Sequence, residues 1–145
     1  MPRMEINKGF LLLAAGIAAF CAYGCSRPLS TETFVRSDRS LDGVYIFELD
    51  LPDSLASYDI WFYSRTVNEP LASLPLNVQW LAPSGKRFSE RVYMKSVDAD
   101  GEKELYRSGV VPSETGKWQL SVRPLGVDEN FCGLGVICEE HHGTR

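Results

Sequence analysis

Histidine is nearly absent from this sequence of 145 residues, whose only two histidines are His141 and His142. No Gly-x-Ser-x-Gly motif occurs either, so a serine–histidine or cysteine–histidine catalytic set would have to recruit the last few residues of the chain. The 19 acidic residues include no pair that the sequence marks as the two carboxylates of a glycosidase. These absences predict a protein that is not an enzyme.

Clusters of charge of one sign are also lacking. The chain has 15 basic and 19 acidic residues and a net charge of −4, and neither sign forms a long run. The basic stripe that nucleic-acid-binding proteins carry is missing, and an acidic balance opposes adsorption to anionic lipids through charge. We therefore expect no nucleic-acid partner, and we expect any membrane attachment to have another source.

Metal-binding spacings are missing as well. The acidic loop 98–102 (Asp-Ala-Asp-Gly-Glu) loosely resembles a calcium loop, but Lys103 and Gly109 then occupy positions six and twelve, where a glycine and a glutamate are needed. The adjacent histidines point to opposite sides of an extended chain and do not easily share a metal ion. The sequence thus predicts a solvated acidic loop, a frayed polar tail over 139–145, and no metal site.

The first 25 residues contain the clearest motif. Two basic residues precede an uncharged run, 9–24, that is shorter than the roughly 20 residues of a membrane-spanning helix. The run ends in Ala-Tyr-Gly directly before Cys25, the arrangement of a bacterial lipoprotein signal peptide, although Ala22 takes the usual place of leucine and Tyr23 is bulky. We predict a signal peptide over 1–24 and a lipid on Cys25; secretion without lipid and a retained N-terminal anchor are the alternatives.

A lipid on Cys25 would place the protein in the bacterial cell envelope, with the outer membrane as the expected site. Two or three acyl chains hold a protein stably, whereas one chain holds it only marginally. Residues 26–29 (Ser-Arg-Pro-Leu) contain no acidic sorting cluster, which slightly favours the periplasmic face. The covalent lipid is the only cofactor expected, and the membrane is the first expected partner.

Residues 25–42 are polar and show little periodicity, so we predict a lipidated N-terminus followed by a short tether. Phe34 and Val35 are the residues of this stretch that would dock onto the domain as a short edge segment. A wholly disordered tether is the alternative.

From residue 43 onward, short runs of alternating apolar and polar residues are separated by turn residues. Along 74–81, for example, every second side chain is apolar, and 83–86 (Pro-Ser-Gly-Lys) then supplies a tight turn. Seven such runs, with no helical stretch, predict an all-β fold: a single antiparallel β-sandwich over 43–138, jelly-roll or immunoglobulin-like. The predicted strands are 44–49, 58–67, 74–81, 87–95, 105–111, 117–124 and 131–138.

Aromatic residues are the strongest candidates for contacts with a ligand. Alternation along 58–67 sends Trp61 and Tyr63 to one face of the strand and three other side chains to the opposite face: Tyr58, Ile60 and Phe62. One set must enter the core, and the other is either covered by the protein or exposed as a platform for sugar rings or a partner. We favour the covered alternative and name Trp61, Tyr63 and Trp80 as the possible partner or glycan contacts.

Two arginines at strand positions are expected to form ion pairs. Arg65 and Arg107 have Asp59 and Glu90 as expected partners. Surface pairs of this kind contribute about 0–1 kcal/mol, so we assign them a structural role.

The mature chain would keep two cysteines, Cys132 and Cys138, since Cys21 leaves with the signal peptide and Cys25 takes the lipid. Six residues of extended strand separate two Cα atoms by about 20 Å, and a disulfide needs less than about 7 Å. We therefore predict free thiols on one face of a strand. A disulfide closed by a sharp turn at Gly133 or Gly135 is the alternative.

Several short motifs share an order that resembles a known family. They are 58–60 (Tyr-Asp-Ile), 62–65 (Phe-Tyr-Ser-Arg), 74–78 (Leu-Pro-Leu-Asn-Val) leading into 83–86, 116–118 (Gly-Lys-Trp) and 133–136 (Gly-Leu-Gly-Val). With the lipoprotein signal, the chain resembles the gliding-motility-associated lipoprotein family GldH of the Bacteroidetes. The resemblance implies a small exported lipoprotein, accessory to surface motility or to protein export, and transfers no catalytic residue.

The sequence thus leads to a first hypothesis, a lipid-anchored, non-enzymatic envelope protein that presents a strand edge or an aromatic face to an envelope protein partner. A second hypothesis is a lipid-anchored glycan-binding module that uses Trp61, Tyr63 or Trp80. A third is a structural surface lipoprotein with no stable partner.

Overall fold

Eight strands and one short 3-10 helix run through residues 29–68, 73–95 and 102–141, which are the residues that the computed structural model describes. In chain order, the elements are β1 (Ser30–Arg36), η1 (Ser37–Arg39), β2 (Tyr45–Leu51), β3 (Ser57–Thr66), β4 (Leu74–Leu81), β5 (Arg87–Met94), β6 (Glu104–Val110), β7 (Gly116–Pro124) and β8 (Phe131–His141). No helix among these residues is long and apolar enough to span a membrane.

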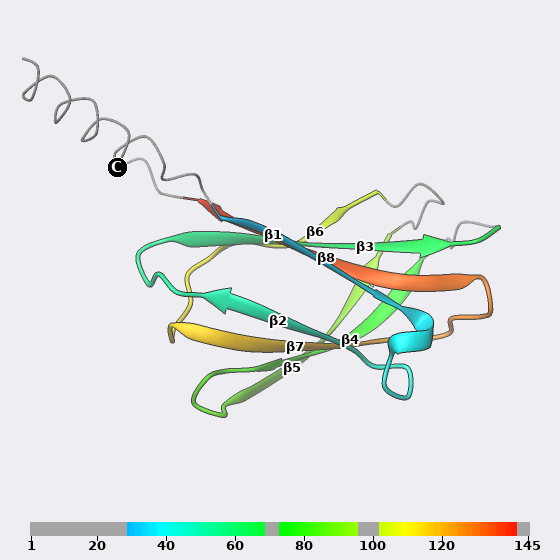
Figure 1. Cartoon of the computed structure of the whole chain (residues 1–145), viewed down its shortest axis with the longest axis horizontal. Helices are drawn as coiled ribbons and strands as arrows, with labels where there is room; N and C mark the ends of the chain where they lie inside the picture. The colour runs from blue at the N-terminus through cyan, green and yellow to red at the C-terminus, as the bar shows by residue number, and fades with distance from the viewer. Residues whose placement is uncertain (1–28, 69–72, 96–101, 142–145) are drawn as a thin grey trace, which may run out of the picture.

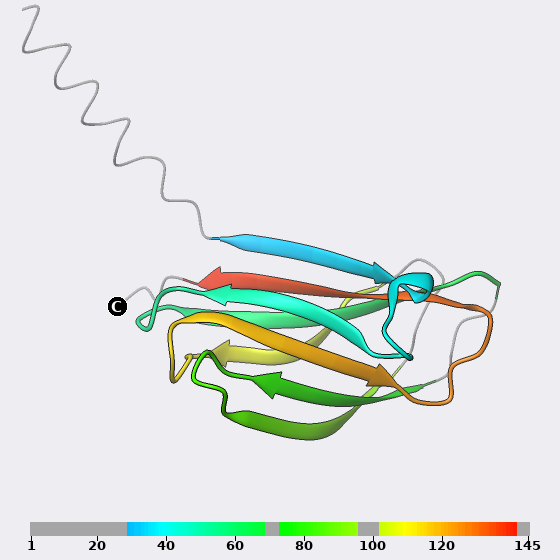
Figure 2. The same ribbon diagram turned by 60° about the horizontal axis from the view of Figure 1, so that its bottom comes forward.

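The strands form two four-stranded sheets, with the orders β1-β8-β3-β6 and β2-β7-β4-β5, packed face to face (Figures 1 and 2). The first four strands pair with the last four in reverse order, β1 with β8, β2 with β7, β3 with β6 and β4 with β5, always antiparallel. This is the pattern of one long hairpin rolled into a sandwich, the jelly roll. The predicted antiparallel sandwich is confirmed, with the jelly-roll connection of its strands.

The inward faces of both sheets supply one apolar core. Along β2, every second residue from Tyr45 to Leu51 is buried and the residues between them are exposed. This period of two is what half-buried strands require, and β4 and β7 repeat it. The largest fully buried side chains come from both sheets: Tyr58, Phe47, Phe62, Leu51, Ile60, Leu74, Leu76, Leu120, Leu134, Val78 and Val122.

At the N-terminal end of the domain, the structure has a strand within the predicted tether. β1 lies inside 25–42 and pairs with β8 over all of its seven residues. Phe34 and Val35, the expected docking residues, are half-buried members of this strand. The sequence did not predict this strand, because the residues before Phe34 are polar. An edge strand with an exposed outer face needs few apolar side chains.

At the C-terminal end, β8 continues beyond the predicted boundary at residue 138. Its last three residues pair with the start of β3, and His141 lies opposite Ser57. Backbone hydrogen bonds hold this end of the strand, so its polar sequence does not prevent pairing. Residues 139–141 are therefore not the frayed tail that was predicted; 142–145 lie outside the described residues.

β1 is attached to its sheet by two aromatic rings that meet over a glycine. Phe34 on β1 and Tyr63 on β3 both lie opposite Gly135 of β8, which runs between them. Their rings stack with centroids 5.7 Å apart and planes inclined by 18°. A Cβ atom on Gly135 would lie 2.1 Å from the ring of Tyr63, so any side chain there collides with it.

We expect Gly135→Ala to destabilise the domain by about 2–3 kcal/mol, because the added methyl group forces the ring of Tyr63 out of place. Chemical denaturation followed by tryptophan fluorescence measures the change. In a Tyr63→Leu background, the same substitution should cost at least about 1 kcal/mol less, since the ring that it meets is gone. Equal costs in the two backgrounds would contradict this account of the contact.

The two cysteines of the described residues, Cys132 and Cys138, are free thiols on β8, as predicted. Cys138 belongs to the core, and burial, followed by the nearby Glu140, raises the pKa of its thiol to about 11. A register shift at the start of β8 places Phe131 rather than Cys132 in the core. The expectation that both thiols lie on one face of the strand is therefore wrong. The register shift adds one residue on β8, which breaks the alternation of side chains.

Candidate functional site

Tyr63, one of the proposed ligand contacts, lies on the outer face of the sheet β1-β8-β3-β6 but is only 5% exposed. Phe34 stacks on its ring, and its hydroxyl donates a hydrogen bond of 2.6 Å to Oε1 of Glu32 on β1. Burial and the Glu32 carboxylate raise the pKa of Tyr63 to about 12. The side chain therefore attaches β1 to its sheet and leaves little ring surface for a ligand.

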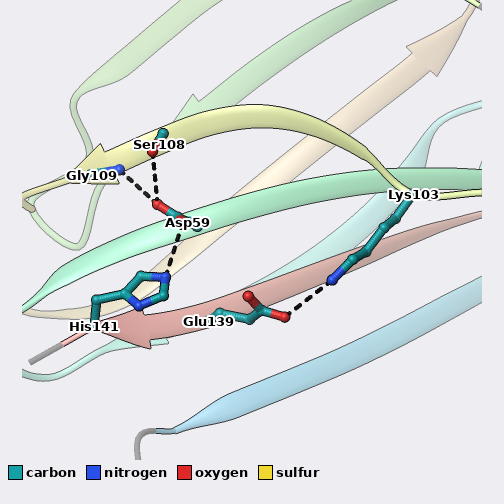
Figure 3. Close-up of polar contacts among 6 residues, drawn as sticks. All are labelled: Asp59, Lys103, Ser108, Gly109, Glu139 and His141. Atoms are coloured by element: carbon teal, nitrogen blue, oxygen red, sulfur yellow. Dashed lines mark hydrogen bonds and ion pairs between the residues drawn. The ribbon is translucent and has the colours of Figure 1, made fainter.

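Trp61, the second proposed contact, lies on the same outer face and is half-buried. The ammonium group of Lys103 sits 4.4 Å from the centroid of its indole ring, and the same ammonium lies 3.4 Å from Oε1 of Glu139 (Figure 3). A cation over an aromatic face contributes about 0.5–1 kcal/mol at an exposed site. With Trp61 and Tyr63 both covered, this face favours the structural interpretation over a glycan platform.

A polar cluster joins the ends of β3, β6 and β8 around Asp59 (Figure 3). Oδ1 of Asp59 accepts hydrogen bonds from the backbone N–H of Gly109 at 2.8 Å and from the hydroxyl of Ser108 at 3.1 Å. Its Oδ2 lies 2.9 Å from Nε2 of His141. The Gly109 N–H, with smaller contributions from Ser108 and His141, outweighs the effect of burial and lowers the pKa of the Asp59 carboxyl.

The order of groups in this cluster differs from that of a catalytic triad. In a triad, the histidine stands between the serine and the carboxylate, where it takes the proton of the hydroxyl. Here Asp59 stands between Ser108 and His141, and the hydroxyl donates to the carboxylate. The cluster therefore joins three strand ends, and His141 is not positioned to activate Ser108.

Asp59→Asn should lower the free energy of unfolding at pH 7 by about 1 kcal/mol, since a carboxylate accepts stronger hydrogen bonds than an amide oxygen. Because the pKa of Asp59 is lowered in the folded state, its stabilisation is complete above about pH 5 and is lost as the pH falls through the folded-state pKa. Wild type and variant should therefore converge in acid, as measured by denaturation at stepped pH. Asp50→Asn, an exposed carboxylate on β2, is the control. A difference in the free energy of unfolding between wild type and Asp59→Asn that persists to pH 2 would contradict a lowered pKa of Asp59.

Trp80, the third proposed contact, lies on β4 of the other sheet, at the side of the sandwich where β5 and β6 form the free edges of the two sheets. We call this edge of the sandwich the β5–β6 seam. Trp80 meets Trp118 edge to face, with ring centroids 6.0 Å apart, and stacks with Tyr106 at 6.3 Å. A pocket of about 450 Å³ opens beside these rings, and most of its lining is apolar, including Leu51, Phe88, Val110 and Val111.

A hydrogen-bonded network bridges the two sheets in the middle of the seam. Nη2 of Arg107 lies 2.5 Å from Oε2 of Glu90, while the hydroxyl of Tyr106 donates to the other carboxylate oxygen and accepts a bond of 3.0 Å from Nε1 of Trp80. Burial alone would raise the pKa of Glu90, but the bonds from Arg107 and Tyr106 outweigh it and lower that pKa. Burial and then Glu90 raise the pKa of Tyr106 to about 12. The predicted pairing of Arg107 with Glu90 is confirmed, whereas Arg65 forms no ion pair within the described residues.

Exposed apolar side chains gather along the β5–β6 seam. Phe88 and Val111, at the large pocket, are 53% and 62% exposed, and Leu105, at an adjacent pocket of about 120 Å³, is 43% exposed. β5 and β6 each have one strand neighbour within the described residues. Backbone groups on the free side of an edge strand are available to a further strand. The seam thus combines two strand edges with apolar pockets between them.

Sequence reasoning named Trp80 but missed Phe88, Tyr106 and Trp118 as members of the same site. Alternation gives the inward orientation of Phe88 and Trp118 correctly. At the edge of a sandwich, however, inward-facing side chains also reach solvent. The order of strands within a sheet decides which positions are at an edge, and periodicity carries no information about that order.

Metal binding and lipidation concern residues that the structure covers only in part. Within 29–68, 73–95 and 102–141, no three histidine, cysteine or acidic side chains are grouped so as to hold a metal ion. Most of the acidic loop 98–102 and Cys25 lie outside the described residues. The predictions for them stay predictions.

Comparison with known proteins assigns no family to this chain. It matches no protein-family model, and no curated protein matches it. What the protein does is therefore inferred from its own residues and their arrangement.

Proposed function

We propose that the protein is a lipid-anchored, non-enzymatic component of the bacterial cell envelope, accessory to surface motility or protein export, that binds an envelope protein through the β5–β6 seam. The seam carries the proposal, because it joins free strand edges to exposed apolar side chains. The leader that ends at Cys25 and the resemblance to the GldH lipoproteins support the location and the role.

The chemistry of the seam suits an extended segment of a partner protein. A peptide that adds to a free edge gains main-chain hydrogen bonds, and its alternate side chains enter pockets beside that edge. At the seam, Phe88 and Val111 flank a pocket of about 450 Å³ that has room for an apolar anchor residue. Buried anchors of this type supply most of the energy of a protein interface.

A short link to the lipid supports a fixed orientation of the domain. β1 starts at Ser30, so four residues lie between it and Cys25, and the five Cα–Cα steps from Cys25 to Ser30 span at most about 18 Å. The loops 52–56, 82–86 and 111–115 lie at the same end of the sandwich as Ser30 (Figure 1). A lipid on Cys25 would turn this end toward the membrane, with the seam running away from the lipid surface.

A glycan-binding module that uses Trp61 and Tyr63 finds less support. Tyr63 is nearly buried, and Lys103 lies over the ring of Trp61. Trp80 does border a pocket, but most of the lining of that pocket is apolar.

The lipid anchor predicts that the mature chain begins at an acylated Cys25. Intact-protein and peptide mass spectrometry of the membrane fraction should find this modification, because a lipoprotein signal is cleaved directly before the modified cysteine. Cys25→Ala should leave the membrane fraction or stay unprocessed. An unmodified chain in the soluble periplasmic fraction of the wild type would refute the anchor, leaving only a secretion signal.

The seam predicts that Val111→Arg weakens the capture of an envelope partner by about tenfold or more, because a charge placed in an apolar contact must be desolvated. Co-purification from detergent extracts of the envelope, quantified by mass spectrometry, measures the loss. Val67→Arg is the matched control, since Val67 is equally exposed at 62% and lies at the other end of the sandwich. A partner that both variants retain equally would exclude the seam as its binding site.

A further inference from the structure

A polar hollow of about 540 Å³ lies on the outer face of the sheet β2-β7-β4-β5, over β4, β5 and β7. It is on the opposite face of β5 from the apolar pockets of the seam. Its outward-facing side chains are all polar, and we call these six the polar patch: Asn77, Gln79, Ser89, Arg91, Ser121 and Arg123. They include two cations and no carboxylate.

The strand register arranges the polar patch in two rows. Asn77 on the middle strand β4 lies opposite both Arg91 on β5 and Arg123 on β7. In the next row, Gln79 lies between the two serines in the same way. Since neighbouring strands are about 4.8 Å apart, the Cα atoms of the two arginines are about 10 Å apart across Asn77. Guanidinium, amide and hydroxyl groups thus line the same hollow.

Neutral acceptors hold both guanidinium groups. Nε of Arg91 donates a bond of 3.0 Å to Oδ1 of Asn77, and Nη1 of Arg123 donates one of 3.0 Å to the backbone carbonyl of Asp42. In the part of the chain that the structure describes, neither arginine forms an ion pair. Glu90 borders the hollow, but its carboxylate is bound within the seam. The patch therefore carries two uncompensated positive charges on a chain of net charge −4.

We infer that the polar patch binds an anionic saccharide. The guanidinium groups would take the carboxylate or phosphate of an acidic sugar, for which their planar donor forks are suited. The amides and hydroxyls both donate and accept, so they match the hydroxyl groups of the same sugar. Tyr93, 63% exposed, lies two residues beyond Arg91 on the same face of β5 and offers an aromatic surface next to the polar patch. The site shares the lining residues Ser89 and Glu90 with the large pocket of the seam, but it does not rest on the function proposed for the seam.

Two other classes of ligand fit the polar patch less well. A protein interface centres on large apolar or aromatic anchors in pockets, and the six residues of the patch include none. Nucleic acid is bound by stripes of many cations along the phosphate backbone, and the patch has only two.

Isothermal titration calorimetry on the full chain in non-ionic detergent tests the inference. The probes are trigalacturonic acid and mannose 6-phosphate, with maltotriose and inorganic phosphate as the neutral and sugar-free controls. We expect at least one acidic sugar to bind, and both controls to bind about tenfold more weakly or not at all, because each control lacks one of the two matched chemistries.

Substitutions locate the binding on the patch. The double variant R91Q/R123Q should lower the affinity for the acidic sugar about tenfold or more, because both charge-assisted contacts are lost. Arg65→Gln, which removes one positive charge from the outer face of the other sheet, should leave the affinity unchanged. Thermal melts of each variant establish that the exposed substitutions keep the fold.

Three results would overturn the inference. The first is that neither acidic sugar binds. The second is that inorganic phosphate binds as tightly as the acidic sugar, which would leave a simple anion site. The third is that R91Q/R123Q keeps the wild-type affinity, which would place the binding elsewhere.

Discussion

The sheet that carries β1 depends on one close approach, the passage of two aromatic rings over the bare backbone of Gly135. β8 lies between β1 and β3, and only a residue without a side chain lets Phe34 and Tyr63 stack across it. Backbone pairing of a single edge strand is weak without side-chain contacts of this kind. Because β1 begins at Ser30, the same contact also helps to hold the first described residues against the sandwich.

β5 illustrates how a strand at the edge of a sandwich serves two surfaces. Its inward residues, such as Phe88 and Glu90, belong to the seam, and its outward residues, such as Ser89 and Arg91, belong to the polar patch. Alternation points the two sets of side chains to opposite faces of the strand, although Ser89 and Glu90 line both the large pocket and the polar hollow. An apolar partner segment and an acidic sugar would therefore lie on opposite faces of the same strand and meet at Ser89 and Glu90.

Much of the fold is readable from the sequence, because alternation and turn residues act locally. β4 has the predicted bounds, and the inward and outward faces around Trp61 are those expected. What failed depends on partners that are distant in sequence. β1 and the end of β8 have polar sequences and are strands because other strands pair with them, and His141 lies 2.9 Å from Asp59, which is far away in the chain. The site was only partly visible for the same reason, since strand order decides that Trp80 and Phe88 lie at an open edge.

The rolled topology has a consequence for the order of events during folding. β8, the last strand, sits inside its sheet between the first strand and β3, so this sheet cannot form until the C-terminal residues are available. Contacts that join such distant residues form slowly, because a long loop must close first. If a signal peptide directs this chain through a membrane from its N-terminus, the sheet that contains β8 closes only after β8 has crossed. The connectivity thus ties closure of this sheet to the arrival of residues 131–141.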